Sequence, residues 1–244
     1  VARRDGDVSP SFQAGDDPTP EGLDVQELEL SFAADVDPYF RMRAFLTMPS
    51  ADEIEIEEAF LETTSLPRGF ALKAGTFRSS FGRNNEQHLH VQDFARRPKM
   101  TAILDEDGLR APGAQLSWLL PLPWYTALSV EALGLAQRPS VTAELEQFFD
   151  LSDTWSLLWG LSGANLQRGL AEDAEEGAAE PDREWLLGTD VYLKWKPTNV
   201  VDTYAWVALT AEYAMSRTAD KAWDGSGYAQ IVAQVARRWR VGVR

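Results

Sequence analysis

The chain has 244 residues, 44% of them hydrophobic, and its 38 acidic and 23 basic side chains give a formal net charge of −15. The hydrophobic fraction is too high for a disordered chain, and so acidic a chain lacks the basic face of a nucleic-acid binder. The absence of cysteine excludes disulfides, thiolate metal sites and cysteine nucleophiles. The length allows one large domain or two small ones.

The first 22 residues are rich in Pro, Gly, Asp and Ser and show no hydrophobic periodicity. Such a composition indicates a flexible N-terminal leader over residues 1–22. The remaining residues, 23–244, carry regular patterning and are expected to form a single domain.

Apolar and polar residues alternate with a period of two along most of this domain. The first run, from Leu28 to Val36, ends at the turn Asp37-Pro38, and a second run follows from Phe40 to Met48. A period of two is typical of β-strands with one apolar and one polar face. Similar runs occupy residues 54–57, 70–75, 141–146, 155–161, 187–196, 207–213 and 229–235.

Residues 111–130 carry no charge and are long enough for a spanning helix. Pro121 and Pro123 would break that helix in its middle, so the segment reads as two strands joined by a turn at residues 121–123.

Strands of about ten residues are longer than the roughly 5–6 residues usual in globular proteins. They match the length of about 9–11 residues that a tilted strand needs to cross a bilayer. Many of the nine tryptophans lie near the ends of predicted strands. Outer-membrane barrels carry girdles of aromatic residues at the same position, where their strands meet the membrane surface. The sequence therefore predicts an all-β fold, an antiparallel transmembrane β-barrel of the outer-membrane type. Eleven strands and the beginning of a twelfth are counted, so the full protein is expected to have 12 or more, with its last strands beyond this sequence. A soluble β-sandwich or lipocalin-like barrel is the alternative.

Strand parity then predicts which charged side chains face the lumen. In the third strand the period slips after Glu57, so a β-bulge near Glu57 and Glu58 is expected to return the later acids to the inner face. The predicted pore-lining residues are Glu27, Glu29, Arg41, Arg43, Glu55, Glu57, Lys73, Glu144, Glu146, Asp190, Lys194 and Lys196.

The longest insertion, residues 83–110, brings Arg83, Arg96, Arg97, Lys99 and Arg110 into an otherwise acidic protein and contains both histidines of the chain. Because opposite charges attract strongly in a confined lumen, this loop is expected to fold inward and narrow the pore. Arg83, Arg96 and Arg97 are expected to contact inward acids. His88 and His90 would lie at the constriction, where they could hold zinc together with Asp93. A purely structural role, hydrogen-bonding the loop, is the alternative for both histidines.

Several short motifs resemble a known family. They are Leu66-Pro67-Arg68-Gly69, Lys73-Ala74-Gly75-Thr76-Phe77, Phe81-Gly82-Arg83-Asn84, His88-Leu89-His90 and Gln115-Leu116-Ser117-Trp118. They resemble the bacterial proteins labelled zinc-regulated TonB-dependent outer-membrane receptors, and more distantly the porins. The resemblance covers roughly residues 23–244. It implies an outer-membrane barrel that takes up solutes. The 22 residues before the first strand are too few for a plug domain, which favours a plug-free, porin-like channel.

The function expected from these features is uptake of small solutes or ions through an outer-membrane channel, with zinc as one candidate. The alternative is a structural barrel that anchors or scaffolds an envelope complex without transport. Both histidines lie in one loop, which disfavours a barrel enzyme, and no cofactor other than zinc is expected. The expected partners are outer-membrane lipids and lipopolysaccharide, the solute, and a second copy or an envelope complex; nucleic acid is not among them.

Overall fold

The computed structural model describes residues 11–12, 24–25, 28–50, 53–105, 108–134, 139–168, 182–198, 204–218 and 221–244. The expected leader lies outside these residues, except for the two-residue strand β1 (Ser11–Phe12), which pairs in parallel with β2 (Asp24–Val25). The predicted pore-lining residue Glu27 also lies outside the described residues.

The described chain forms one antiparallel sheet of twelve strands, in which each strand pairs with its neighbours in sequence. This confirms the all-β, antiparallel fold class. The strands are β3 (Leu28–Asp35), β4 (Phe40–Ser50), β5 (Glu53–Thr63), β6 (Phe70–Arg78), β7 (Arg110–Leu119), β8 (Tyr125–Leu133), β9 (Ser140–Asp150), β10 (Trp155–Arg168), β11 (Asp182–Trp195), β12 (Trp206–Thr218), β13 (Asp224–Ala236) and β14 (Trp239–Val243).

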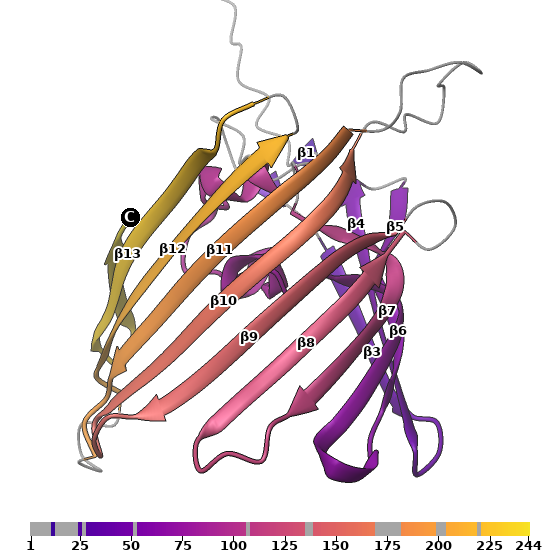
Figure 1. Cartoon of the computed structure of the whole chain (residues 1–244). Helices are drawn as coiled ribbons and strands as arrows, with labels where there is room; N and C mark the ends of the chain where they lie inside the picture. Colours follow the sequence, from indigo (N-terminus) through magenta and orange to yellow (C-terminus); the bar gives the residue numbers. More distant parts are fainter. Residues whose placement is uncertain are drawn as a thin grey trace, which may run out of the picture.

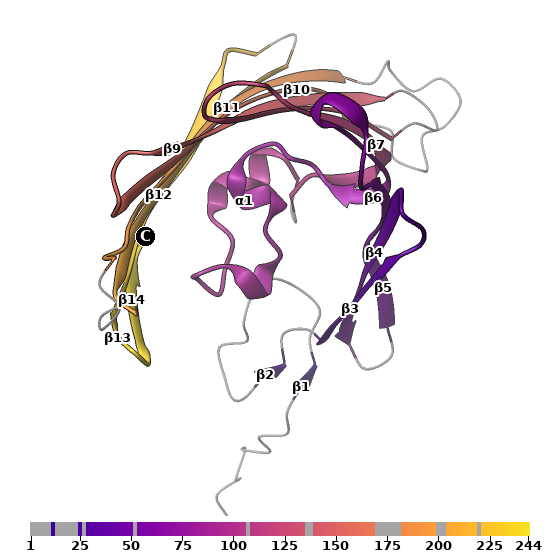
Figure 2. The same cartoon turned by 90° about the horizontal axis from the view of Figure 1, so that it is seen from below.

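The sheet curves into a barrel-like wall, and β3 and β14 are the two ends of its strand order (Figures 1 and 2). The proline turn joins β7 to β8 as predicted, with Leu119 paired to Ala127. β14, the twelfth strand of the sheet, has five residues. None of the helices in the described part of the chain has both the length and the apolar character needed to cross a membrane.

The two faces of the sheet differ in what they bury. Leu28, Leu30 and Trp159 are 48%, 46% and 36% exposed, so the apolar face of the wall is not a buried core. The opposite, concave face buries acids instead: Glu131, Asp190 and Glu212 are at most 4% exposed. A soluble barrel would bury the first set and expose the second.

The predicted bulge is present on β5. Phe45 of β4 pairs with Glu58 while the next residue, Leu46, pairs with Ile56, so Glu57 is the extra residue. The bulge places both glutamates on the inner face, where they are 7% and 8% exposed. It also returns Glu62 to the inside, 3.3 Å from Arg43.

The hydrophobic core lies between the concave face and the connection from β6 to β7. Phe81 of that connection packs in one buried cluster with Leu166 of β10 and Leu186 of β11. Met100 of the short helix η3 (Lys99–Ile103) and Leu104, which directly follows it, join the same cluster. This packing holds the connection inside the curve of the sheet.

Candidate functional site

The connection between β6 and β7, residues 79–109, is called the inner loop here. It contains α1 (Arg83–Glu86), η2 (Leu89–Val91) and η3. It lies within the concave side of the sheet, the inward position expected for it (Figure 2). Its two ends are joined where the backbone N–H of Ser79 donates to the carbonyl of Leu109 at 2.9 Å.

Glu131 of β8 is the first anchor of the inner loop. One of its carboxylate oxygens accepts the Ser79 hydroxyl at 2.5 Å, and the other accepts the backbone N–H of Ser80 at 2.9 Å. Gln115 and Thr142 of the neighbouring strands donate to the same carboxylate. Glu131 is 1% exposed, so this buried carboxyl group depends on its four hydrogen bonds.

Glu212 of β12 is the second anchor, on the other side of the loop. Its carboxylate accepts the backbone N–H of Asn84 at 2.8 Å. Nearby, the backbone N–H of Gly82 donates to the Ser162 hydroxyl at 3.1 Å. Gly82 has φ of 72°, a conformation that favours glycine and lets the chain turn onto the wall here.

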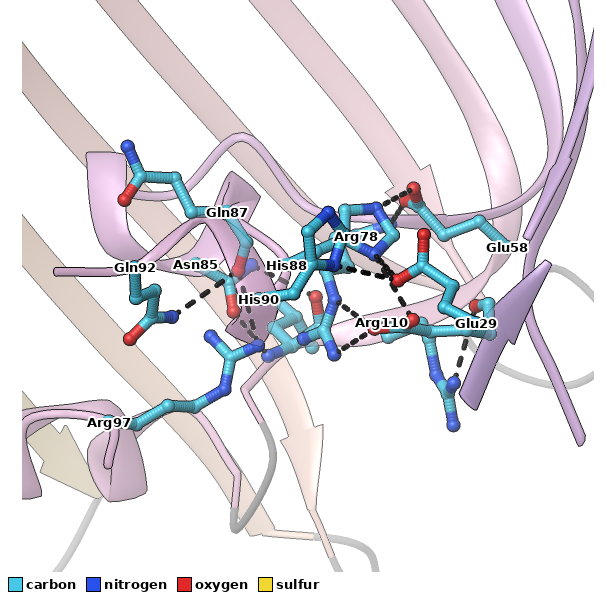
Figure 3. A network of polar contacts seen from close by, with 12 residues as sticks. Glu29, Glu58, Arg78, Asn85, Gln87, His88, His90, Gln92, Arg97 and Arg110 are labelled. Carbon is cyan, nitrogen blue, oxygen red and sulfur yellow. Dashed lines mark hydrogen bonds and ion pairs between the residues drawn. The ribbon is translucent and has the colours of Figure 1, made fainter. Parts of the chain in front are cut away.

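The two histidines of the loop meet three glutamates of the wall (Figure 3). The Nδ1 and Nε2 atoms of His88 lie 3.1 Å from Glu57 and 3.0 Å from Glu58. Glu29 of β3 lies 3.4 Å from Nδ1 of His88 and 3.0 Å from Nδ1 of His90. We call these five residues the histidine latch. Arg78 supports it, because its guanidinium pairs with Glu57 at 2.6 Å.

The surroundings of His88 favour its charged form. Burial opposes the charge, but hydrogen bonds and charge attraction from Glu57 and Glu58 outweigh burial and raise the pKa of His88 to about 10. At neutral pH His88 is therefore an imidazolium that donates from both ring nitrogens, and it joins the inner loop to β5 by ion pairs.

The latch also has the donor set of a metal site. One carboxylate oxygen of Glu29 and one nitrogen from each histidine all lie within 4.8 Å of one another. The oxygen Oε2 of Glu29 is buried, and it is the atom that faces Nδ1 of both histidines. Asp93, the carboxylate expected from the sequence, is not in this group: it pairs with Arg240 of β14 at 3.1 Å. Asp93 comes after the short helix η2, which contains His90, and its carboxylate pairs with Arg240. Glu29 takes the position expected for Asp93.

The three loop arginines lie in different surroundings. Arg83 lies 4.2 Å from the Tyr192 ring centroid and within electrostatic reach of Asp190 and Glu212. Arg97 donates to the backbone carbonyls of Asn84 and Gln87, within the loop itself. Arg96 is exposed. The contacts between wall acids and the loop described above use backbone N–H groups, hydroxyls and both histidines.

The other predicted pore-lining residues are spread along the wall. Arg41 pairs with Asp35 at 2.8 Å, and Lys73 lies 5.1 Å from the ring centroid of Phe60. Glu144 and Asp190 are buried, Glu146 and Lys194 are partly buried, and Glu55 and Lys196 are exposed.

Sequence reasoning missed some residues of the site. Glu131 and Glu212 fall on the inner face by parity, but nothing in the sequence distinguishes them as anchors of a distant loop. Arg78 ends β6, and its pairing with Glu57 depends on the bulge. Only the bulge prediction pointed toward Glu58.

Comparison with known proteins gives one similarity to report. An uncharacterized protein of Aquifex aeolicus (strain VF5) is 34% identical over 259 residues. The aligned region covers 91% of this chain and 54% of that protein, so the chain spans about half the length of the curated relative it matches. No family model matches the chain.

Proposed function

We propose that this chain forms part of the wall of a porin-like channel in the bacterial outer membrane. In this proposal the exposed apolar face of the sheet contacts lipid and lipopolysaccharide, and the acidic concave face lines a water-filled lumen. A lipid-exposed sheet must have its backbone groups paired and its apolar side chains outward. Leu28, Leu30 and Trp159 on the exposed face have the chemistry that this arrangement requires.

The observation that carries the channel proposal is the inner loop. It is fixed to β8 through Glu131, to β12 through Glu212 and to β3 and β5 through the histidine latch. A segment attached to strands on opposite sides of a lumen narrows the path between them. The loop would then set the size and charge of the small solutes or ions that pass.

A structural barrel that anchors an envelope complex is the second candidate. The apolar cluster formed by Phe81, Met100 and Leu104 against the wall favours it, because it fills the space between loop and sheet with side chains. If that packing closes the lumen, the protein transports nothing.

Planar-bilayer recording separates the two candidates. The channel proposal expects discrete current steps when the purified protein inserts, and a scaffold with a filled lumen is silent. Persistent silence of correctly inserted protein would refute the channel.

We also propose that the latch can hold zinc. Ligands of a tetrahedral zinc at about 2.0–2.1 Å lie about 3.3–3.4 Å from one another. The separations of 3.4 Å and 3.0 Å from Glu29 to the two histidine nitrogens are close to that spacing. Zinc must displace the proton of His88, so its affinity should rise with pH up to about 10.

Calorimetric zinc titration tests this site at pH 6.5 and pH 7.5, where zinc stays in solution. Tighter binding at pH 7.5 is expected, and His90→Ala should weaken binding strongly. His90 is a suitable target because it is 49% exposed by side chain and its ion-pair partner is Glu29, so its loss leaves the His88 contacts in place. Zinc binding that His90→Ala does not change would place the metal elsewhere, and no binding would make both histidines structural.

A further inference from the structure

We infer that a cavity on the far side of the inner loop binds small organic carboxylates with a flat apolar part. The cavity has a volume of about 210 Å³ and lies between the loop and the inner face of β11, β12, β13 and β14. Given about 30 Å³ per water molecule in the liquid, this is room for about seven waters or one small organic anion. The inference rests on the proposed function only where it identifies this ligand as the solute that the channel transports. Binding of the ligand can be tested without measuring transport.

The cavity is basic within an otherwise acidic protein. Arg83, Arg240 and Arg244 line it, and Asp93 is the one carboxylate in its lining among the described residues. Asp93 pairs with Arg240 at 3.1 Å. No ion pair is found for the Arg83 guanidinium among the described residues, so its donors remain available to a bound anion. A guanidinium matches a carboxylate in a bidentate geometry.

The arginines are held in place by aromatic rings. The guanidinium of Arg83 lies 4.2 Å from the ring centroid of Tyr192, and that of Arg240 lies 5.1 Å from the ring centroid of Trp206. Such stacking fixes the plane of the guanidinium before a ligand arrives, which lowers the entropy lost on binding.

The rest of the lining explains why the anion should carry a ring. Phe94 of the loop, whose ring centroid lies 4.8 Å from the Arg244 guanidinium, and Tyr228 of β13 also line the cavity, so aromatic rings border the guanidinium groups. Aromatic side chains favour stacking with another flat group. Benzoate, one carboxylate on one ring, is the simplest compound with both features.

The position of the cavity gives the inference its functional meaning. The histidine latch attaches the loop to β3 and β5, and the cavity lies on the side of the loop that faces β11–β14, where Glu212 and Arg240 also contact the loop. A solute that passes the loop on this side would meet Arg83 and Arg240. The substrate class assigned to the channel is therefore small aromatic or other flat carboxylates.

Calorimetric titration of the purified protein in detergent micelles tests the inference. Benzoate should bind saturably, and benzyl alcohol, which has the ring without the charge, should bind at least about tenfold more weakly because charged hydrogen bonds are the stronger ones. Arg83→Gln should weaken benzoate binding at least about tenfold. Arg83→Lys keeps the positive charge but loses the bidentate guanidinium, so its affinity for benzoate should lie between those of the wild type and Arg83→Gln. Arg217→Gln is the matched control, because Arg217 is an exposed residue of β12 outside the cavity lining.

Three results would overturn the inference: benzoate and benzyl alcohol binding equally, wild type and both Arg83 variants binding equally, or no benzoate binding. Inorganic phosphate, which has the charge without the ring, should bind more weakly than benzoate, and equal binding would refute the role of the aromatic lining. Benzoate binding by a protein that passes no current would refute the channel and leave the binding site standing. Channel current from a protein that does not bind benzoate would refute the binding site and leave the channel proposal standing.

Discussion

Replacing Glu131 with Gln should loosen the inner loop without unfolding the wall. The carboxylate accepts two hydrogen bonds from the loop, from the Ser79 hydroxyl at 2.5 Å and the Ser80 N–H at 2.9 Å. Hydrogen bonds to a charged group are worth about 1.5–3 kcal/mol and are about twice as strong as neutral ones. Losing half the strength of each of these two bonds costs about 1.5–3 kcal/mol in total, which raises the detached population of the loop by about 10- to 150-fold.

Hydrogen exchange at the loop amides measures this population directly. The amides of Ser80 and Asn84 should exchange faster in Glu131→Gln by the factor given above. Glu146→Gln is the control, because it makes the same charge change on the neighbouring strand β9 and no hydrogen bond to the loop is found for it among the described residues. Equal protection of the loop in wild type and Glu131→Gln would refute the anchoring role of Glu131.

Three further predictions follow from the same geometry. Deleting residues 87–99 removes the histidine latch but keeps both anchors, so single-channel conductance should rise; unchanged conductance would show that the loop does not limit flow. The pKa of His88 is raised from 6.5 to about 10, so its contribution to loop attachment is fully present below pH 6.5 and is lost as the pH rises through about 10. Loop proteolysis between pH 6 and pH 11 should increase at the upper end, and a flat profile would count against the latch. Leu187→Arg, on the exposed face of β11, should destabilise the protein in bilayers by about 2–4 kcal/mol; Lys194→Arg on the inner face should be neutral, and equal tolerance of both would mean that Leu187 does not face lipid.

The architecture could be predicted from the sequence because it depends on a local pattern. Alternation in runs such as Leu28 to Val36, and the proline turn near Pro121, specify strands and hairpins whose partners are neighbours in sequence. The bulge was predictable for the same reason, since Glu58 would otherwise face outward. These features need no knowledge of distant contacts.

The site was less predictable because it joins residues far apart in the chain. Glu29 and His90 meet only when the inner loop crosses the concave face, and short-range proximity had suggested Asp93 instead. The inward fold of the loop was expected. Its anchors are mainly backbone N–H groups and hydroxyls, which carry no signal in the composition of the loop.

The central claim is that one face of the sheet contacts lipid and the other contacts water. Because the chain has no cysteine, single cysteines introduced at Leu72 and at its neighbour Lys73 on β6 can report on the two faces separately. Leu72 is 46% exposed on the apolar face, and Lys73 belongs to the inner face. A thiol in apolar surroundings stays protonated and unreactive. In intact outer membranes, a charged, membrane-impermeant thiol reagent should label Lys73→Cys and leave Leu72→Cys unlabelled; fast labelling of Leu72→Cys with protection of Lys73→Cys would contradict the account.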